Sequence, residues 1–77
     1  MRRARIDSTS LESVGYEAES KTLEVEFAGG AVYQYLEVPA AEHRKFMRAR
    51  SRGAYLNQHI KPRFLCRPIK TSRATQA

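Results

Sequence analysis

The clearest pattern along this chain is a strict alternation of apolar and polar residues in the segment TLEVEFA (22–28). Three large apolar side chains alternate there with one threonine and two glutamates, which is typical of a strand with one buried face. The flanking segments LESVGYEA (11–18) and AVYQYLEV (31–38) predict two more strands, because they are rich in β-branched and aromatic residues. We expect the three strands to form an antiparallel meander.

The Gly29-Gly30 turn sets how the second and third strands pair. A two-residue turn would pair Val25 with Gln34 and would place Tyr33 and Tyr35 beside the glutamates. A three-residue loop, with its last glycine in the left-handed conformation, pairs Val25 with Tyr33 and puts both tyrosines on the apolar face. A shift of one residue exchanges the two faces of a strand, so the need for one buried face favours the three-residue loop.

Two short helices are expected after the strands. Pro39 suits the first turn of a helix over 40–50, and Ser51 can cap a second helix over 52–60 that ends before Pro62. The expected fold class is therefore α+β, a three-stranded antiparallel β-meander followed by two short helices packed on one face. We assign residues 1–7 to a flexible lead-in, 8–65 to a single domain and 66–77 to a basic, flexible tail.

Size and composition limit the function classes. A chain of 77 residues forms one domain with a thin core, and its 42% hydrophobic residues are too many for a disordered chain. No run of about 18 apolar residues is present, which argues against a membrane partner, and the N-terminus lacks the apolar stretch of an export signal. Cys66 is the only cysteine, which fits a reducing, cytoplasmic setting.

Charge is divided unevenly between the two halves. Residues 1–42 hold all eight acidic residues and four basic ones, whereas residues 43–77 hold ten basic residues and no acidic one. Arginines outnumber lysines ten to four, and the planar guanidinium group suits phosphate. We therefore expect a polyanion, RNA first, as partner, although a basic helix face can also be simply solvated. The candidate contact residues are Arg44, Lys45, Arg48, Arg52, Lys61, Arg63 and Arg67, and the three at positions 44, 48 and 52 would form an outward ridge if the first helix ran that far.

Tyr33 and Tyr35 allow two interpretations. They can pack against the apolar stripe of the neighbouring strand, which is favoured because a small sheet needs large side chains to fill its core. Alternatively, their rings can stack on unpaired bases, as aromatic rings on RNA-binding sheets do. Both tyrosines are therefore candidate nucleic-acid contacts.

Catalysis and metal binding find little support. His43, His59 and Cys66 are too few and too scattered for a metal site, and neither a phosphate-binding loop nor a dinucleotide fingerprint is present. We expect no catalytic residues, no metal and no cofactor, with both histidines structural and the cysteine incidental.

An ordered set of short motifs resembles a known family. The segments VGY (14–16), LEVEFAGG (23–30), YQY (33–35), VP (38–39) and ARSRGAYLNQHI (49–60) are similar to those of the KTSC domain. That domain occurs at the C-terminus of some lysyl-tRNA synthetases and as small stand-alone bacterial proteins. The resemblance covers about residues 8–60 and implies a common fold. The attachment to a synthetase implies RNA binding, although the family's function is not established.

Two functions of different classes follow. The first is a non-catalytic nucleic-acid-binding accessory module, RNA preferred, that contacts phosphates through its basic C-terminal half. The second is a protein-interaction module that docks on an acidic or apolar surface of a larger partner. The salt dependence of nucleic-acid binding distinguishes them.

Overall fold

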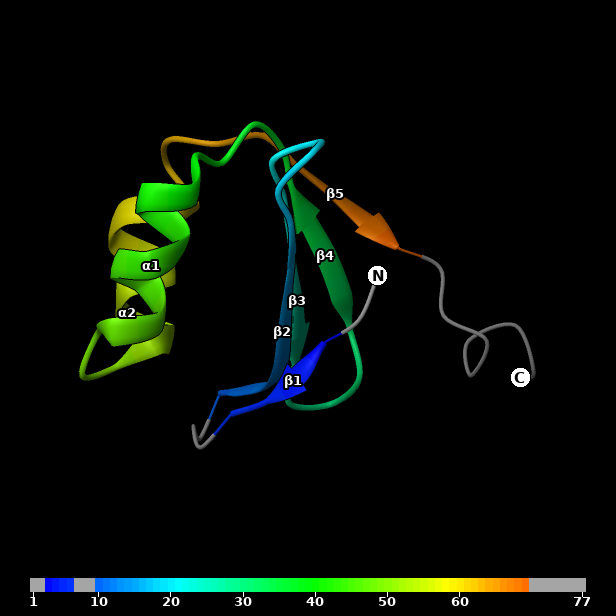
Figure 1. Ribbon diagram of the computed structural model, residues 1–77. Helices are drawn as coiled ribbons and strands as arrows, with labels where there is room; N and C mark the ends of the chain where they lie inside the picture. Colours follow the sequence, from blue (N-terminus) through cyan, green and yellow to red (C-terminus); the bar gives the residue numbers. More distant parts are fainter. Residues whose placement is uncertain (1–2, 7–9, 70–77) are drawn as a thin grey trace.

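The computed structural model describes residues 3–6 and 10–69, and it has an α+β fold built on one antiparallel sheet (Figure 1). The five strands follow one another across the sheet in the order of the chain. The helical segments lie between the fourth and fifth strands in sequence and cover one face of the sheet, while the other face is uncovered (Figure 1). The elements are β1 (Ala4–Arg5), β2 (Leu11–Glu17), β3 (Thr22–Phe27), β4 (Val32–Tyr35), α1 (Ala40–Arg48), α2 (Arg52–Tyr55), η1 (Leu56–Ile60) and β5 (Cys66–Ile69).

The expectation of three strands was therefore incomplete, because both edges of the sheet carry one more strand. β1 pairs with β2 through Ala4 and Val14, within the segment that we assigned to a lead-in. β5 pairs with β4 from Cys66 opposite Tyr35 to Ile69 opposite Val32, within the segment that we assigned to the tail. The rest of the expected flexible tail, residues 70–77, lies outside the described residues. Neither extra strand has the alternation that made β3 recognisable.

The pairing of β3 with β4 confirms the three-residue loop. Val25 lies opposite Tyr33, and Leu23 lies opposite Tyr35. The Phe27 N–H donates to the Ala31 carbonyl oxygen over 2.8 Å, and both turn glycines have a φ of 101°, a value that favours glycine. The tyrosines consequently share the apolar face with Val25, as expected.

The core lies between this apolar face and the helices. Tyr35 is 1% exposed, and Phe46 and Ile60 are fully buried, so the sheet, α1 and η1 each contribute a large side chain. Gly53 allows α2 to lie close to the start of β2. A Cβ atom at this position would be only 2.6 Å from the Ser10 Oγ atom, so a larger residue would clash. The whole buried cluster comprises Leu11, Val14, Leu23, Val25, Tyr35, Val38, Phe46, Leu56 and Ile60.

The helices follow the expected order with two differences. Ser51 caps α2 as expected, since its Oγ accepts a hydrogen bond from the Ala54 N–H over 3.2 Å. However, α1 ends at Arg48, before the residues that would have extended it to position 50. The second helix changes at Leu56 into the π-helix η1, in which the Lys61 N–H donates to the Leu56 carbonyl over 2.8 Å. Leu56 and Ile60, at the two ends of η1, are both buried.

Candidate functional site

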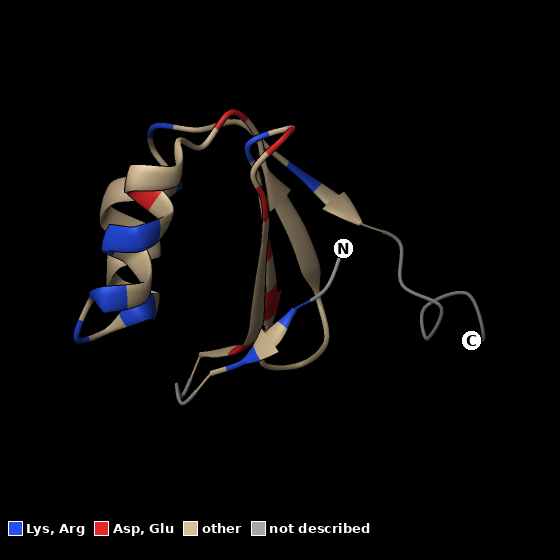
Figure 2. Ribbon diagram, viewed as in Figure 1, with Lys and Arg blue, Asp and Glu red and all other residues tan. Residues whose placement is uncertain are grey.

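The outward side of α1 carries three exposed cations, Arg44, Lys45 and Arg48, which we call the α1 basic face. The helix fixes their spacing, and its opposite side is anchored by the buried Phe46 ring. Within residues 3–6 and 10–69, none of the three forms an ion pair with a carboxylate. Figure 2 shows basic segments on the helical layer and acidic segments along β3. The face can therefore offer its full charge to an external anion.

Arg52 does not extend this face, which corrects the expected outward ridge. Because α1 ends at Arg48, Arg52 begins α2 and its side chain turns back. Its Nη2 atom donates to the Met47 carbonyl oxygen over 2.9 Å, and its Nε atom is buried without a partner in the described part of the chain. Arg52 therefore closes the C-terminal end of α1 and does not reach outward beside Arg44.

Arg63 lies beside the buried carboxylate of Glu42. Its Nη1 atom is 3.5 Å from the Glu42 Oε1 atom, and the Tyr55 hydroxyl donates to the other oxygen of the same carboxylate. Burial, followed by the hydrogen bond with Glu42, raises the pKa of Tyr55 to about 12. Arg63 therefore has a carboxylate partner inside the molecule, unlike the three cations of the α1 basic face.

Arg67 lies on β5, in a polar network on the uncovered face of the sheet. Its Nε and Nη2 atoms donate to the Gln34 Oε1 atom over 3.0 and 2.8 Å, and Gln34 donates in turn to Glu24 over 2.8 Å. Arg3 reaches the other oxygen of Glu24 at 2.8 Å. We call this set the sheet-face network, and its members are Arg3, Ser13, Glu24, Glu26, Gln34 and Arg67.

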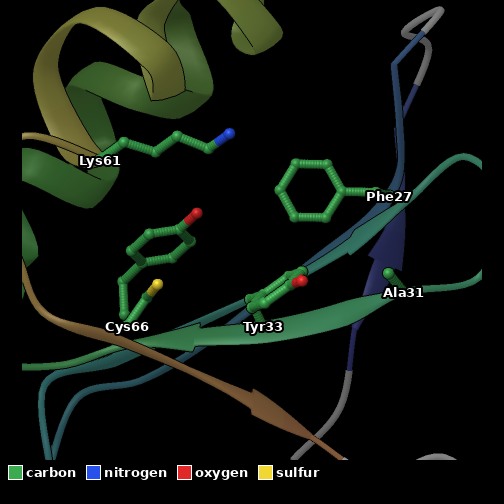
Figure 3. A pocket seen from close by; sticks show the side chains of 6 residues that line it. Phe27, Ala31, Tyr33, Lys61 and Cys66 are labelled. Carbon is green, nitrogen blue, oxygen red and sulfur yellow. The ribbon is translucent and has the colours of Figure 1, made fainter.

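Lys61 borders a third region, a hollow of about 480 Å³ at the open end of the core. Its Nζ atom lies 5.6 Å from the centre of the Phe27 ring, which meets the Tyr33 ring edge to face at 5.6 Å. Figure 3 shows Lys61, Phe27 and Tyr33 around this one space. We call it the aromatic hollow, and its lining residues are Phe27, Ala31, Tyr33, Tyr35, Lys61 and Cys66.

The two tyrosines of the third predicted strand differ in accessibility. Tyr35 is 1% exposed and belongs to the core, so its ring is not an open platform for a base. Burial, with smaller contributions from Cys66 and Tyr33, raises its pKa to about 12. Tyr33 is only half-buried, on the same side of the sheet. Packing therefore explains Tyr35, while Tyr33 keeps surface for a contact.

The histidines and the cysteine lie apart from one another. His43 stacks on Tyr16 with ring centres 4.5 Å apart, and burial, followed by the charge of Arg44, lowers its pKa. His59 is exposed and lies against the Tyr55 ring, and Cys66 is an exposed free thiol. In the described ranges, no group of three or more metal-ligating side chains comes together. No helix in that same part of the chain is long and apolar enough to cross a membrane.

Comparison with known proteins places this chain in a family. The sequence model of the KTSC domain matches residues 7–64. The chain belongs to the KTSC domain family. A crystal structure of a KTSC domain protein from Yersinia pestis superposes with a TM-score of 0.84, at 40% sequence identity, over 90% of this chain and 97% of that one.

Relatives of this KTSC domain are of two sizes. An uncharacterized protein of Stutzerimonas stutzeri is 44% identical over 62 residues, which is 80% of this chain and 87% of that protein. A lysine–tRNA ligase of Nostoc punctiforme is 33% identical over 58 residues, which is 75% of this chain but only 10% of the ligase. The domain therefore occurs both nearly alone and as a small part of a synthetase.

The candidate residues of this KTSC domain fall into separate regions. The α1 basic face keeps Arg44, Lys45 and Arg48 together, whereas Lys61 borders the aromatic hollow and Arg67 belongs to the sheet-face network. Sequence reasoning missed that Lys61 and Phe27 meet, because the π-turn before Lys61 has no recognisable sequence pattern. The predicted strand register did place Phe27 on the same face as the tyrosines, and these residues line the aromatic hollow.

Proposed function

We propose that this KTSC domain is a non-catalytic nucleic-acid-binding accessory module that prefers RNA and contacts its phosphates through the α1 basic face. The observation that carries the proposal is the set of three exposed cations on α1 with no carboxylate paired to them among the described residues. Like charges on neighbouring helical turns repel one another and destabilise a helix. An external polyanion removes that cost.

Two further observations support RNA as the polyanion. Two of the three cations are arginines, whose planar guanidinium group can donate two parallel hydrogen bonds to one phosphate. The chain also matches a segment of lysine–tRNA ligases, which are named for an RNA substrate. The proposed setting is the cytoplasm, where an exposed free thiol such as that of Cys66 stays reduced.

The test is a titration of the full chain with labelled single-stranded RNA, duplex RNA and single-stranded DNA of equal length, at several salt concentrations. If three cations neutralise phosphates of a single strand, the logarithm of the binding constant should fall with the logarithm of salt with a slope of about −2. The double variant Arg44→Gln/Arg48→Gln should lose about tenfold in affinity at low salt, and its slope should flatten by about 1.4.

A matched control removes the same charge elsewhere. Arg5 and Lys21 are exposed residues on the sheet side of the molecule, and Arg5→Gln/Lys21→Gln lowers the net charge by the same two units. This variant should bind RNA within about twofold of the wild type if the location of charge matters beyond its amount. Equal losses in both double variants would show a diffuse charge effect and would contradict a site on α1.

Protein docking is the second candidate function, and one observation favours it. Leu65 is 78% exposed and stands next to the partly buried Phe64, on the loop before β5. An exposed leucine of this kind suits an apolar partner surface, while the basic face suits an acidic one. Absence of RNA binding at low salt, where charge is least screened, would reject the nucleic-acid proposal in favour of docking.

A further inference from the structure

We infer that the aromatic hollow is a pocket for one unpaired nucleobase of the bound strand, with the neighbouring phosphate held by Lys61. The inference rests on the proposed function and names a second, base-contacting part of the same interface. The pocket has three components: a wall of aromatic rings, a polar group at the bottom of the hollow and a cation at its rim.

The ring wall comes from Tyr33 and Phe27. Their rings stand at 77° to each other with centres 5.6 Å apart, so they form a corner and do not cover each other's faces. Tyr33 is half-buried, which holds its orientation while leaving surface exposed. A planar base can stack on one ring of such a corner and meet the second ring with its edge.

The polar group is the Tyr35 hydroxyl. The residue is 1% exposed and lines the hollow, and no hydrogen bond joins its hydroxyl to another described residue. Because this hydroxyl is not among the fully buried polar atoms without a partner, it reaches the space of the hollow and can bond a group that enters it. With its pKa raised to about 12 the phenol stays protonated, so it can donate to a carbonyl oxygen or ring nitrogen of a base.

The cation is Lys61, which the π-turn of η1 presents at the rim. Its ammonium group lies over the Phe27 ring at 5.6 Å, and it has no carboxylate partner in the part of the chain that the structure describes. π-turns inside helices are rare and often occur at functional sites. A flexible lysine stem allows the ammonium to move from the ring to a phosphate that follows the base.

The dimensions agree with one base. The hollow has a volume of about 480 Å³, within the range of about 300–1,000 Å³ of small-ligand sites, so it has room for a base. Base stacking on aromatic side chains tolerates every base, because each base offers a π face. The pocket should therefore add affinity for single strands without fixing a sequence.

The test compares two ligands with equal phosphate number, a 12-unit oligouridylate and a 12-unit ribose-phosphate oligomer that lacks bases. The wild type should bind the oligouridylate about tenfold more tightly, because only that ligand can fill the pocket. Tyr33→Leu keeps an apolar side chain and should remove most of this preference while leaving the affinity for the abasic oligomer unchanged. Arg44→Gln/Arg48→Gln should weaken both ligands equally and keep the preference.

Two conservative variants, which should remain folded, test the pocket independently of Tyr33→Leu. Tyr35→Phe removes only the unpaired hydroxyl and should lower the preference by a factor of about three, the value of one modest hydrogen bond. Lys61→Gln changes an exposed side chain and should reduce the salt slope by about 0.7, as expected for one phosphate contact on a single strand. A preference that survives both Tyr33→Leu and Tyr35→Phe would overturn the pocket.

Failure of the pocket and failure of the proposed function give different results. Equal binding of both oligomers by the wild type would overturn the pocket and leave the α1 basic face intact. Uridine 5′-monophosphate supplies a second readout by NMR, since it contains one base and one phosphate and cannot span two sites. Shifts of the Phe27 ring signals that are weaker in Tyr35→Phe and absent in Tyr33→Leu would support the pocket even if the α1 variants bind RNA normally.

Discussion

The uncovered face of the sheet and the α1 basic face both carry several cations, but the cations on the sheet have hydrogen-bond partners and those on α1 do not within the described residues. On the sheet, Arg3 bonds Glu24 of β3 and Arg67 bonds Gln34 of β4, so that each guanidinium has a partner on a strand of the sheet. On α1, Arg44 and Arg48 have no such partner among the described residues. Net charge alone therefore does not mark a binding surface, because a cation that is already paired has less to gain from an external anion.

The difference follows from the geometry of the elements. Strand pairing brings residues from distant parts of the chain to about 5 Å from one another. Glu24 of β3 therefore meets Arg3 from one end of the described sequence, and Gln34 of β4 links it to Arg67 from the other end. A surface helix contacts the core on one side only, and its outward residues can pair mainly with residues three or four positions away. Because residues 43–77 contain no acidic residue, Arg44 and Arg48 lack partners at those positions. Glu42 lies three residues before Lys45, but its buried carboxylate contacts Tyr55 and Arg63 instead.

Removing the buried ring of α1 tests whether this helix is held on the core strongly enough to present a fixed surface. Phe46 is fully buried on the inner side of α1, and Phe46→Ala should lower the free energy of unfolding by about 3–5 kcal/mol. Small domains have only about 5 kcal/mol in total, so the variant should be largely unfolded at room temperature. Urea denaturation followed by circular dichroism measures the loss.

Phe27 is the matched control, because it is a phenylalanine that is only half-buried. Phe27→Ala should cost clearly less, about 1–2 kcal/mol, since fewer contacts are lost. Equal losses in the two variants would show that the inner side of α1 is no better packed than the rim of the aromatic hollow.

Replacing Glu24 tests how much the sheet-face network contributes to the free energy of unfolding. Glu24 is 8% exposed and accepts hydrogen bonds from Arg3 and Gln34. Glu24→Ala should lower the free energy of unfolding by about 2 kcal/mol, because it leaves two donors without their acceptor. Glu12→Ala is the control on the same sheet, where the exposed Arg5 pair should be worth less than about 1 kcal/mol.

Removing two cations from the α1 basic face should change the free energy of unfolding less, and in the opposite direction. Arg44→Gln/Arg48→Gln should leave the free energy of unfolding unchanged or raise it by up to about 0.5 kcal/mol, because the substitution relieves repulsion between unpaired cations. The same denaturation experiment detects it, with Arg5→Gln/Lys21→Gln alongside. A loss above 1 kcal/mol in the α1 variant would reveal a stabilising partner and would remove the contrast between the two faces.

The smallest effect uses His43 as an electrostatic probe of α1. Burial, and then the charge of Arg44, lowers its pKa below the ordinary 6.5, so the stability tied to neutral His43 is present above that pH and is lost as pH falls. Arg44→Gln should raise the pKa of His43, which NMR titration measures directly. No change in Arg44→Gln would mean that the charge of Arg44 is already screened.

The sequence predicted the centre of the sheet well and its edges poorly. The alternation in 22–28 and the two glycines were enough to give the β3–β4 register, because only one register buries a continuous apolar face. β1 has two residues and β5 contains Pro68, so neither carries a pattern that a single sequence can reveal. Their positions depend on pairing with residues far away in the chain.

The candidate site was predicted in part for a related reason. The exposure of Arg44, Lys45 and Arg48 follows from helical periodicity around the buried Phe46, which local sequence determines. Arg52 was misplaced because its direction depends on where α1 ends, and helix ends are the least predictable part of a helix. The aromatic hollow depends on tertiary packing of η1 against β3, which periodicity does not describe.

The π-turn of η1 also makes the length of this segment adjustable. The hydrogen bond from the Lys61 N–H to the Leu56 carbonyl joins residues five positions apart, whereas an α-helical hydrogen bond joins residues four positions apart. Deleting the exposed Gln58 would let the same carbonyl and N–H groups close an ordinary α-helical turn, with Ile60 still in the core. A one-residue shortening here should thus be absorbed by a change of helix type, whereas the same deletion in β3 would turn its buried face outward.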